Sequence, residues 1–245
     1  MMKKKWLSFI GIPLLLMIFF IVYWYYFSKP EPFPTNEQLL TEINNPDIGI
    51  NAVVIQDILP IDKRHVFVPF ISEEGKHGIS SWEWKHRKWK IGVINDYGEM
   101  LIWKIDNKDP KTYHFIWNLQ PQEQISYVKI YLKKDRAHYG TDNIHHYEPA
   151  VQMEQKIELG EKTYGSLQVP KEWVSVIALT NELNADKQPQ WLFDVQQNIY
   201  YGWNSFDKLD NISYIENSLG VSSSWNDSMD IEYLMRFNES NIENP

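Results

Sequence analysis

An uncharged segment near the N-terminus constrains this chain more than any other feature. Residues 6–27 contain no Asp, Glu, Lys or Arg, and this run of 22 residues directly follows Lys3, Lys4 and Lys5. As an α-helix the run would be about 33 Å long, enough to cross the ~30 Å hydrocarbon core of a bilayer. We therefore predict one transmembrane helix over residues 6–27, in contact with the lipid bilayer.

The three lysines predict the orientation of this helix. Positive residues remain on the cytoplasmic side of a span, so residues 1–5 are expected to form a cytoplasmic tail. Residues 23–27 are all aromatic, which suits the headgroup layer on the other side. A cleaved signal peptide is the alternative, but such signals have a shorter apolar core and small residues at the cleavage site. We expect an uncleaved signal-anchor in a single-pass protein of the cell membrane, with the C-terminal domain outside.

Composition excludes several classes of function. The chain has no Cys, which excludes disulfides, thiolate metal sites and Cys nucleophiles. Its net charge is −8, and without the three N-terminal lysines 21 basic residues face 32 acidic ones, a net charge of −11. Nucleic-acid binding needs a dominant basic face, so no nucleic-acid partner is expected. So acidic a domain is also repelled by anionic headgroups and polymers, unless a local basic patch overrides the mean charge.

The rest of the chain is predicted to form a spacer and one β-rich domain. Residues 28–34 contain three prolines, which predict a short extended spacer. The extracytoplasmic domain then covers residues 35–245 and begins with a short helix over 35–43, with Thr35 as its N-cap. Runs of apolar residues between turn residues predict strands over 50–59, 65–71, 79–84, 88–94, 100–105, 113–119, 125–132, 151–159 and 163–169.

From about residue 170 the pattern favours helices. Residues 171–184 have apolar residues at helical spacing, and Asp227 or Ser228 is predicted to begin a helix that ends at Phe237. Residues 191–203 are ambiguous, and the acidic tail from Ser205 onward is expected to be a solvated surface region. The predicted fold is a β-rich α+β exported domain, mainly of antiparallel strands with helices toward the C-terminus, behind one N-terminal transmembrane helix.

Residues 82–90 are the leading candidate for a binding site. A hairpin that turns near His86 and Arg87 would place aromatic rings beside a cluster of cations at its tip. Such rings stack on sugars and such cations pair with phosphate, so an anionic envelope polymer or a membrane-protein partner is the expected ligand. The predicted binding residues are Trp82, Trp84, Lys85, Arg87, Lys88 and Trp89. The same pattern is typical of a plain strand pair with core tryptophans and solvated cations, and the sequence leaves both readings open.

Motifs for catalysis and metal binding are weak. Gly-x-Ser-x-Gly, His-Glu-x-x-His, Gly-x-Gly-x-x-Gly and the phosphate-binding loop do not occur. Residues 138–148 contain three His, one Asp and one Glu, ligand types that suit Zn²⁺, but their spacing matches no metal motif and predicts a polar surface loop. The pairs Glu73/Glu74 and Asp106/Asp109 are conceivable acid–base pairs, although residues 106–110 are also typical of a turn. No catalytic residue, metal or cofactor is predicted.

The sequence thus predicts a non-catalytic module that binds or assembles with an envelope component or a membrane partner. The alternative is an envelope hydrolase that uses a carboxylate pair or the loop over residues 138–148.

Overall fold

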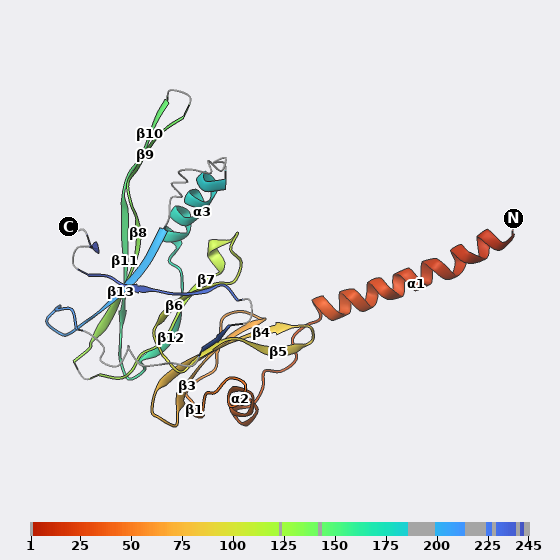
Figure 1. Ribbon diagram of the computed structural model, residues 1–245, viewed down its shortest axis with the longest axis horizontal. Helices are drawn as coiled ribbons and strands as arrows, with labels where there is room; N and C mark the ends of the chain where they lie inside the picture. The colour runs from red at the N-terminus through yellow and green to blue at the C-terminus, as the bar shows by residue number, and fades with distance from the viewer. Residues whose placement is uncertain are drawn as a thin grey trace.

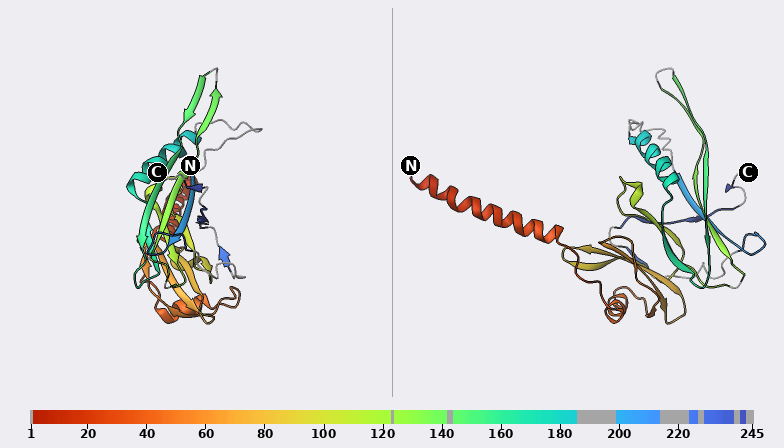
Figure 2. Two further views of the ribbon diagram at one scale, coloured as in Figure 1. Left: turned by 90° about the vertical axis from the view of Figure 1, so that its left-hand side faces the viewer. Right: turned by 180° about the vertical axis from the view of Figure 1, so that it is seen from behind.

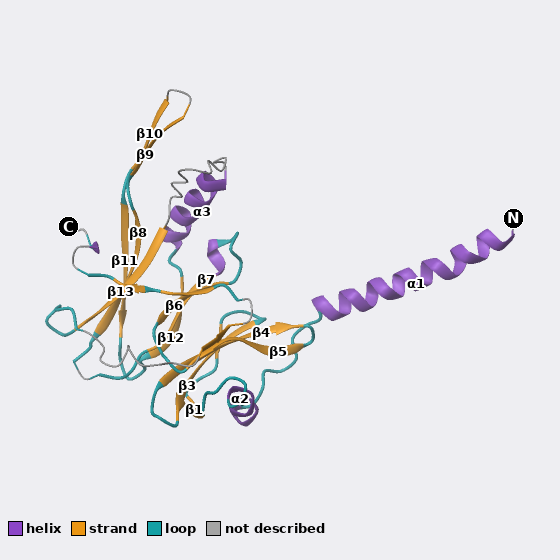
Figure 3. Cartoon of the chain, in the orientation of Figure 1, coloured by secondary structure: helices purple, strands orange, loops and turns teal. Residues whose placement is uncertain are grey.

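The computed structural model describes residues 2–122, 124–141, 144–185, 199–213, 224–226, 229–238 and 241–242, with the side chains of the first helix described from Ile12 onward. Three α-helices lie within these residues: α1 (Met2–Phe27), α2 (Asn36–Ile43) and α3 (Lys171–Ala185). A 3₁₀ turn, η1 (Pro110–Thr112), precedes the seventh strand. The fold is β-rich with few helices (Figure 3).

The described residues contain sixteen strands, most of them antiparallel to their neighbours. They are β1 (Ala52–Ile55), β2 (Leu59–Pro60), β3 (His65–Ser72), β4 (His77–Lys85), β5 (Lys88–Asn95), β6 (Met100–Lys104), β7 (Tyr113–Asn118), β8 (Tyr127–Lys134), β9 (Ala137–Thr141), β10 (Ile144–Glu148), β11 (Val151–Glu158), β12 (Tyr164–Gln168), β13 (Ile199–Phe206), β14 (Ser224–Asn226), β15 (Ile231–Tyr233) and β16 (Met235–Arg236).

These strands form three sheets and one separate hairpin. Sheet A has the order β1-β3-β4-β5-β14, with β2 also paired to β3, sheet B has the order β12-β7-β6-β15, and sheet C has the order β11-β8-β13-β16. Strands β9 and β10 form a hairpin that extends away from the sheets, beyond β8 and β11 (Figure 1). The pairing of β16 with β13 is parallel.

Apolar clusters join the sheets in layers. On one face of sheet A, Val66, Val68 and Phe70 of β3 contact Leu39 and Ile43 of α2. The opposite face of sheet A packs against sheet B through a second cluster, which contains Phe67, Ile79, Leu101, Trp103 and Ile116. The largest cluster fills the space between sheet B, sheet C and α3. Sheet B is therefore buried on both faces.

Strand β7 shows how the side-chain alternation produces this arrangement. Tyr113, Phe115 and Trp117 point into the cluster shared with sheet C and α3, as their period of two predicts. Ile116 points to the other side and is fully buried against sheet A. The predicted alternation of side chains along β7 is confirmed, but the opposite face of the strand is also covered by protein.

Three predictions for the second half of the chain are wrong. The described residues of the segment 138–148 belong to the paired strands β9 and β10 rather than to a loop, and β15 and β16 replace the helix expected over residues 227–237. Asp227 and Ser228 lie outside the described residues, as do residues 191–198 of the ambiguous segment. Strand formation is favoured here because β15 completes the edge of sheet B beside β6, while β16 pairs with β13. Leu234 and Phe237 are buried, so this part of the chain is not a solvated tail.

Helix α1 projects from the sheets, as Figures 1 and 2 show. Its large apolar side chains from Ile12 to Phe27 are between 42% and 69% exposed. Among the residues that the structure describes, no helix is both long and apolar enough to cross a membrane.

Candidate binding site at the end of helix α1

The hairpin of β4 and β5 turns through two residues in an uncommon backbone conformation. His86 has a φ of 54° and Arg87 a φ of 63°, both in the left-handed region. Two consecutive left-handed residues are typical of the type I′ turn that joins antiparallel strands, but Asn and Gly are the residues that usually supply it. Strain of this kind is often retained at functional sites, which directs attention to what His86 and Arg87 contact.

Both turn residues contact the aromatic end of α1. The guanidinium of Arg87 lies over the ring of Trp24, 3.8 Å from its centroid. The imidazole of His86 stacks on Tyr25, with 5.0 Å between the ring centroids and 11° between the planes, and meets Tyr26 edge-on. A cation over an aromatic face is attractive, so the hairpin tip holds the last turn of α1.

Arg64, which lies between β2 and β3, holds the same helix end from a second direction. Its Nη2 donates a hydrogen bond of 2.8 Å to the carbonyl of Ser28, and its Nη1 lies 3.5 Å from the carbonyl of Tyr26. The last carbonyls of a helix lack partners within the helix and attract positive charge. Arg64 supplies these carbonyls with hydrogen-bond donors and with a positive charge. We refer to Arg64, His86 and Arg87 together as the clamp.

The segment expected to be a free spacer is packed along the same hairpin. The carboxylate of Glu31 pairs with Arg87 at 3.0 Å, and the carbonyl of Glu31 accepts a hydrogen bond from the Trp89 indole at 3.0 Å. Phe33 meets the rings of Trp89 and Trp82 edge-on, with centroid distances of 4.8 and 5.7 Å. Residues 28–34 lie in neither a helix nor a strand, and they are attached to the domain at several points.

A groove of about 390 Å³ runs between this segment, α2 and the hairpin. Its apolar walls include Pro32, Pro34 and Trp89, and its polar groups include Glu42 and Lys88. A mixture of aromatic, aliphatic and charged side chains can hold a ligand that has both an apolar and an ionic part.

The six predicted binding residues lie together on the hairpin but differ in burial. Trp82 and Trp84 are 1% and 3% exposed, so they support the hairpin from beneath and offer little surface for stacking. The side chain of Lys85 is 44% exposed and that of Arg87 is 28% exposed. Lys88 is exposed and Trp89 is half-buried. Ligand binding by these residues remains a prediction, with Lys85, Arg87, Lys88 and Trp89 at the surface.

Sequence reasoning did not identify several contributors to this site. Arg64 and Glu31 lie far from the hairpin in sequence, and no motif connects them with residues 82–90. His86 was recognised only as a turn residue. The one signal in the sequence was that residues 23–27 and the tip of the hairpin are both rich in aromatic or cationic side chains.

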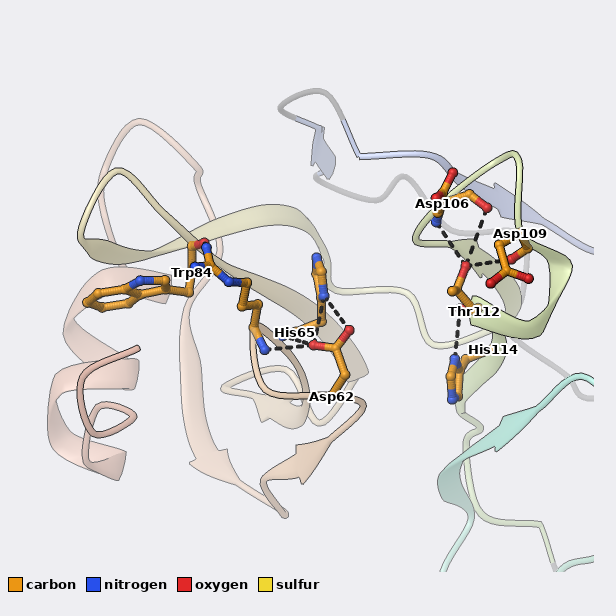
Figure 4. A network of polar contacts seen from close by, with 8 residues as sticks. Asp62, His65, Trp84, Asp106, Asp109, Thr112 and His114 are labelled. Carbon is orange, nitrogen blue, oxygen red and sulfur yellow. Dashed lines mark hydrogen bonds and ion pairs between the residues drawn. The ribbon is translucent and has the colours of Figure 1, made fainter. Parts of the chain in front are cut away.

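The other candidate groups have structural roles, two of which are shown in Figure 4. His65 Nδ1 lies 2.9 Å from the Asp62 carboxylate. Burial opposes ionisation of Asp62, but hydrogen bonds from His65 and the Arg64 amide lower its pKa below the ordinary value. Asp106 and Asp109 accept backbone amide hydrogen bonds within the turn before β7, so the turn interpretation of this pair is the one that the structure supports.

The remaining carboxylate pair and the histidine-rich segment lie elsewhere. Glu73 and Glu74 are both exposed between β3 and β4, where Glu74 pairs with Lys76. In the hairpin β9–β10 the rings of His138 and His145 are stacked, 5.3 Å apart. Within the described part of the chain no group of three or more His, Asp or Glu side chains is placed to share a metal ion.

Comparison with known proteins adds no relative. No protein-family model matches the chain, and no curated protein or solved structure matches it. The functional proposal therefore rests on the contacts within this chain.

Proposed function

We propose that this chain is a single-pass membrane protein whose helix α1 spans the cell membrane. Residues 1–5 then lie in the cytoplasm and residues 35–245 lie outside. The uncharged run over residues 6–27, the lysines before it and the exposed apolar side chains from Ile12 to Phe27 support this orientation.

The domain acts as a non-catalytic module that binds an anionic component of the envelope near the membrane surface. The observation that carries this proposal is the contact of Arg87 with Trp24, because it puts the cationic hairpin tip beside the end of the anchor. The groove between residues 28–34, α2 and the hairpin opens at the same place.

Charge distribution supports an anionic ligand at this end of the domain. The three segments that meet there, 28–31, 62–65 and 83–90, contain seven Lys or Arg and three Asp or Glu, a local net charge of +4. The chain as a whole has a net charge of −8. At physiological ionic strength charges are screened over about 8 Å, so a ligand at this surface responds to the local charge rather than to the distant acidic residues.

Thiol labelling of intact cells tests the topology, because the chain contains no Cys of its own. We would introduce Leu209→Cys, at a side chain that is 80% exposed, and Lys4→Cys in separate variants. A membrane-impermeant maleimide should label position 209 in intact cells and position 4 only after lysis. Labelling of position 209 only after lysis would overturn the proposal.

A binding assay with charge-reversed variants tests the role of the hairpin. Full-length protein in detergent micelles would be offered two anionic probes, phosphatidylglycerol vesicles and soluble polyglycerol phosphate. Lys85→Glu/Lys88→Glu should weaken binding to at least one probe, whereas the control Lys171→Glu/Lys208→Glu, at two exposed lysines on other elements, should not. If neither probe binds, or if both double variants behave alike, the hairpin is not the binding site.

A further inference from the structure

We infer that the anionic component bound at this surface is the phosphate-bearing headgroup of phospholipids with a net negative charge, in the leaflet where α1 ends. This inference rests on the membrane anchoring proposed above and names the partner of the same site. It commits to the lipid surface rather than to a polymer of the envelope.

The tip of the hairpin is held at the depth of the lipid headgroups. Trp24, Tyr25 and Tyr26 belong to the kind of aromatic cluster that lies at the headgroup level of a bilayer. Arg87 and His86 are in direct ring contact with these three residues, so the tip of the hairpin is held at that same level. Figure 2 shows the end of the β4–β5 hairpin beside the end of α1.

Two like charges are paired unfavourably at the tip of the hairpin. Lys85 and Lys88 are direct cross-strand partners on either side of the turn. Like charges directly opposite each other destabilise a strand pair. The ammonium group of Lys85 lies 3.8 Å from the carboxylate of Glu83, which makes a long ion pair. Lys88 is exposed. A phosphate group between the two ammonium groups would convert this repulsion into attraction.

The two lysines differ from the other cations nearby in the partners that they already have. Arg87 is engaged by Glu31 and Trp24, and Arg64 by the carbonyls at the end of α1, so both hold the clamp together. Lys85, Lys88 and the exposed Lys29 have freer ammonium groups at the same level. A Lys ammonium is a compact point charge that suits phosphate.

The direction of approach favours lipid over polymer. A soluble anionic polymer must first diffuse to the hairpin, and it pays the entropic cost of association when it binds. Headgroups need no such approach, because the anchor already holds the tip among them. The local charge of +4 therefore acts first on the partner that lies on the membrane side.

Lipid selectivity of the full-length protein tests the inference. The protein would be reconstituted in nanodiscs with equal amounts of phosphatidylglycerol and phosphatidylcholine, and native mass spectrometry would count the lipids that it retains. Each basic residue at a membrane surface contributes about 1 kcal/mol, so two lysines predict an enrichment of phosphatidylglycerol of roughly 30-fold. Lys85→Gln/Lys88→Gln should lower this enrichment at least fivefold, and Lys171→Gln/Lys208→Gln should leave it unchanged.

Thermal unfolding distinguishes lost binding from lost structure. Because Lys85→Gln/Lys88→Gln removes a repulsive pair, its melting temperature in neutral detergent should equal or exceed that of the unsubstituted protein. Equal retention of the two lipids, or an enrichment that survives Lys85→Gln/Lys88→Gln, would overturn the inference. If polyglycerol phosphate binds through these lysines without lipid selectivity, the partner is a polymer, and the proposed function stands. Failure of the topology test would remove both.

Discussion

The imidazole of His86 stacks on the phenol ring of Tyr25, with 5.0 Å between the ring centroids, although the two residues are 61 positions apart in the chain. This contact joins the tip of the β4–β5 hairpin to the last turn of α1. Together with the contact of Arg87 with Trp24, it joins helix α1 and the domain at this point.

The stacked pair predicts efficient cross-linking between the helix and the hairpin. In the Cys-free chain, a Tyr25→Cys/His86→Cys variant should be joined by a short bis-maleimide, which forms a thioether with each thiol, in isolated membranes, and the closed loop should change its migration on a denaturing gel. The pair Tyr25→Cys/Leu209→Cys serves as the control and should remain unjoined. Equal cross-linking of the two pairs would show that α1 moves freely relative to the domain.

The turn residues His86 and Arg87 should lower the free energy of unfolding while they supply the contacts with α1. Asn-Gly adopts the type I′ turn without the strain that His86 and Arg87 carry, and left-handed backbone costs about 1–2 kcal/mol for each ordinary residue. His86→Asn/Arg87→Gly also removes the contacts of the clamp, so the net gain in unfolding free energy should be about 1 kcal/mol. Chemical denaturation of the full-length protein in detergent measures this gain. The same variant should lose lipid selectivity, and a variant that loses stability as well would show that the clamp outweighs the strain.

The two interactions of Glu31 should differ in their contribution to stability. Its ion pair with Arg87 is largely open to solvent, with side-chain exposures of 60% and 28%, and such pairs contribute between 0 and about 1 kcal/mol. Glu31→Gln should therefore change the melting temperature very little. Trp89→Phe, which removes the hydrogen bond to the Glu31 carbonyl, should cost about 1 kcal/mol. A larger loss from Glu31→Gln than from Trp89→Phe would contradict this order.

Phe115 should be one of the most sensitive positions of the core. It is fully buried and contacts Trp173 of α3 and Tyr201 of β13, with centroid distances of 5.7 and 6.1 Å. Phe115→Ala should lower the unfolding free energy by about 3–5 kcal/mol, because it leaves a cavity where three elements meet. Tyr147→Ala, at a side chain that is 66% exposed, should change it by less than about 0.5 kcal/mol. Denaturation curves of the two variants provide the comparison.

Stability should fall as the solution becomes mildly acidic. Burial lowers the pKa of His77 below its ordinary value of 6.5, although the nearby Asn118 amide oxygen, 3.1 Å from Nδ1, partly opposes this. Burial also lowers the pKa of His114. The unfolded chain therefore takes up protons near pH 6.5 that the folded protein does not, and stability is lost as the pH falls below about 6.5.

Removal of the buried histidine tests this assignment. His77→Gln should reduce the change in melting temperature over this pH range, while His138→Gln, at an exposed position, should leave it unaltered. An undiminished pH dependence in His77→Gln would mean that other groups carry it.

Local patterns were sufficient to predict most of the strands before residue 170. The strand predicted over residues 65–71 is β3 and the one over 113–119 is β7, each within one residue at both ends. The helix predicted from Thr35 is α2, where the Gln38 side chain accepts a hydrogen bond from the Thr35 amide. These elements follow from period-two alternation and helix capping, which act over a few neighbouring residues.

The second half of the chain could not be predicted in the same way. Residues 231–236 become strands because β6 and β13 offer open edges, and these edges exist only after sheets B and C have formed. The local sequence, which places Leu234 and Phe237 at helical spacing, contains no information about these strand edges. Tertiary pairing overrides local preference there.

The sequence by itself determined that residues 6–27 form an uncharged apolar run, that a β-rich region follows, and that a cationic hairpin turns at His86 and Arg87. Only the tertiary structure decided that this hairpin meets Trp24 and Tyr25, that Arg64 caps α1, and that Lys85 and Lys88 stand at the same level. The physical reason is range. Alternation and turn chemistry act between neighbours, whereas the clamp joins residues from three distant segments that come together only when sheet A has formed.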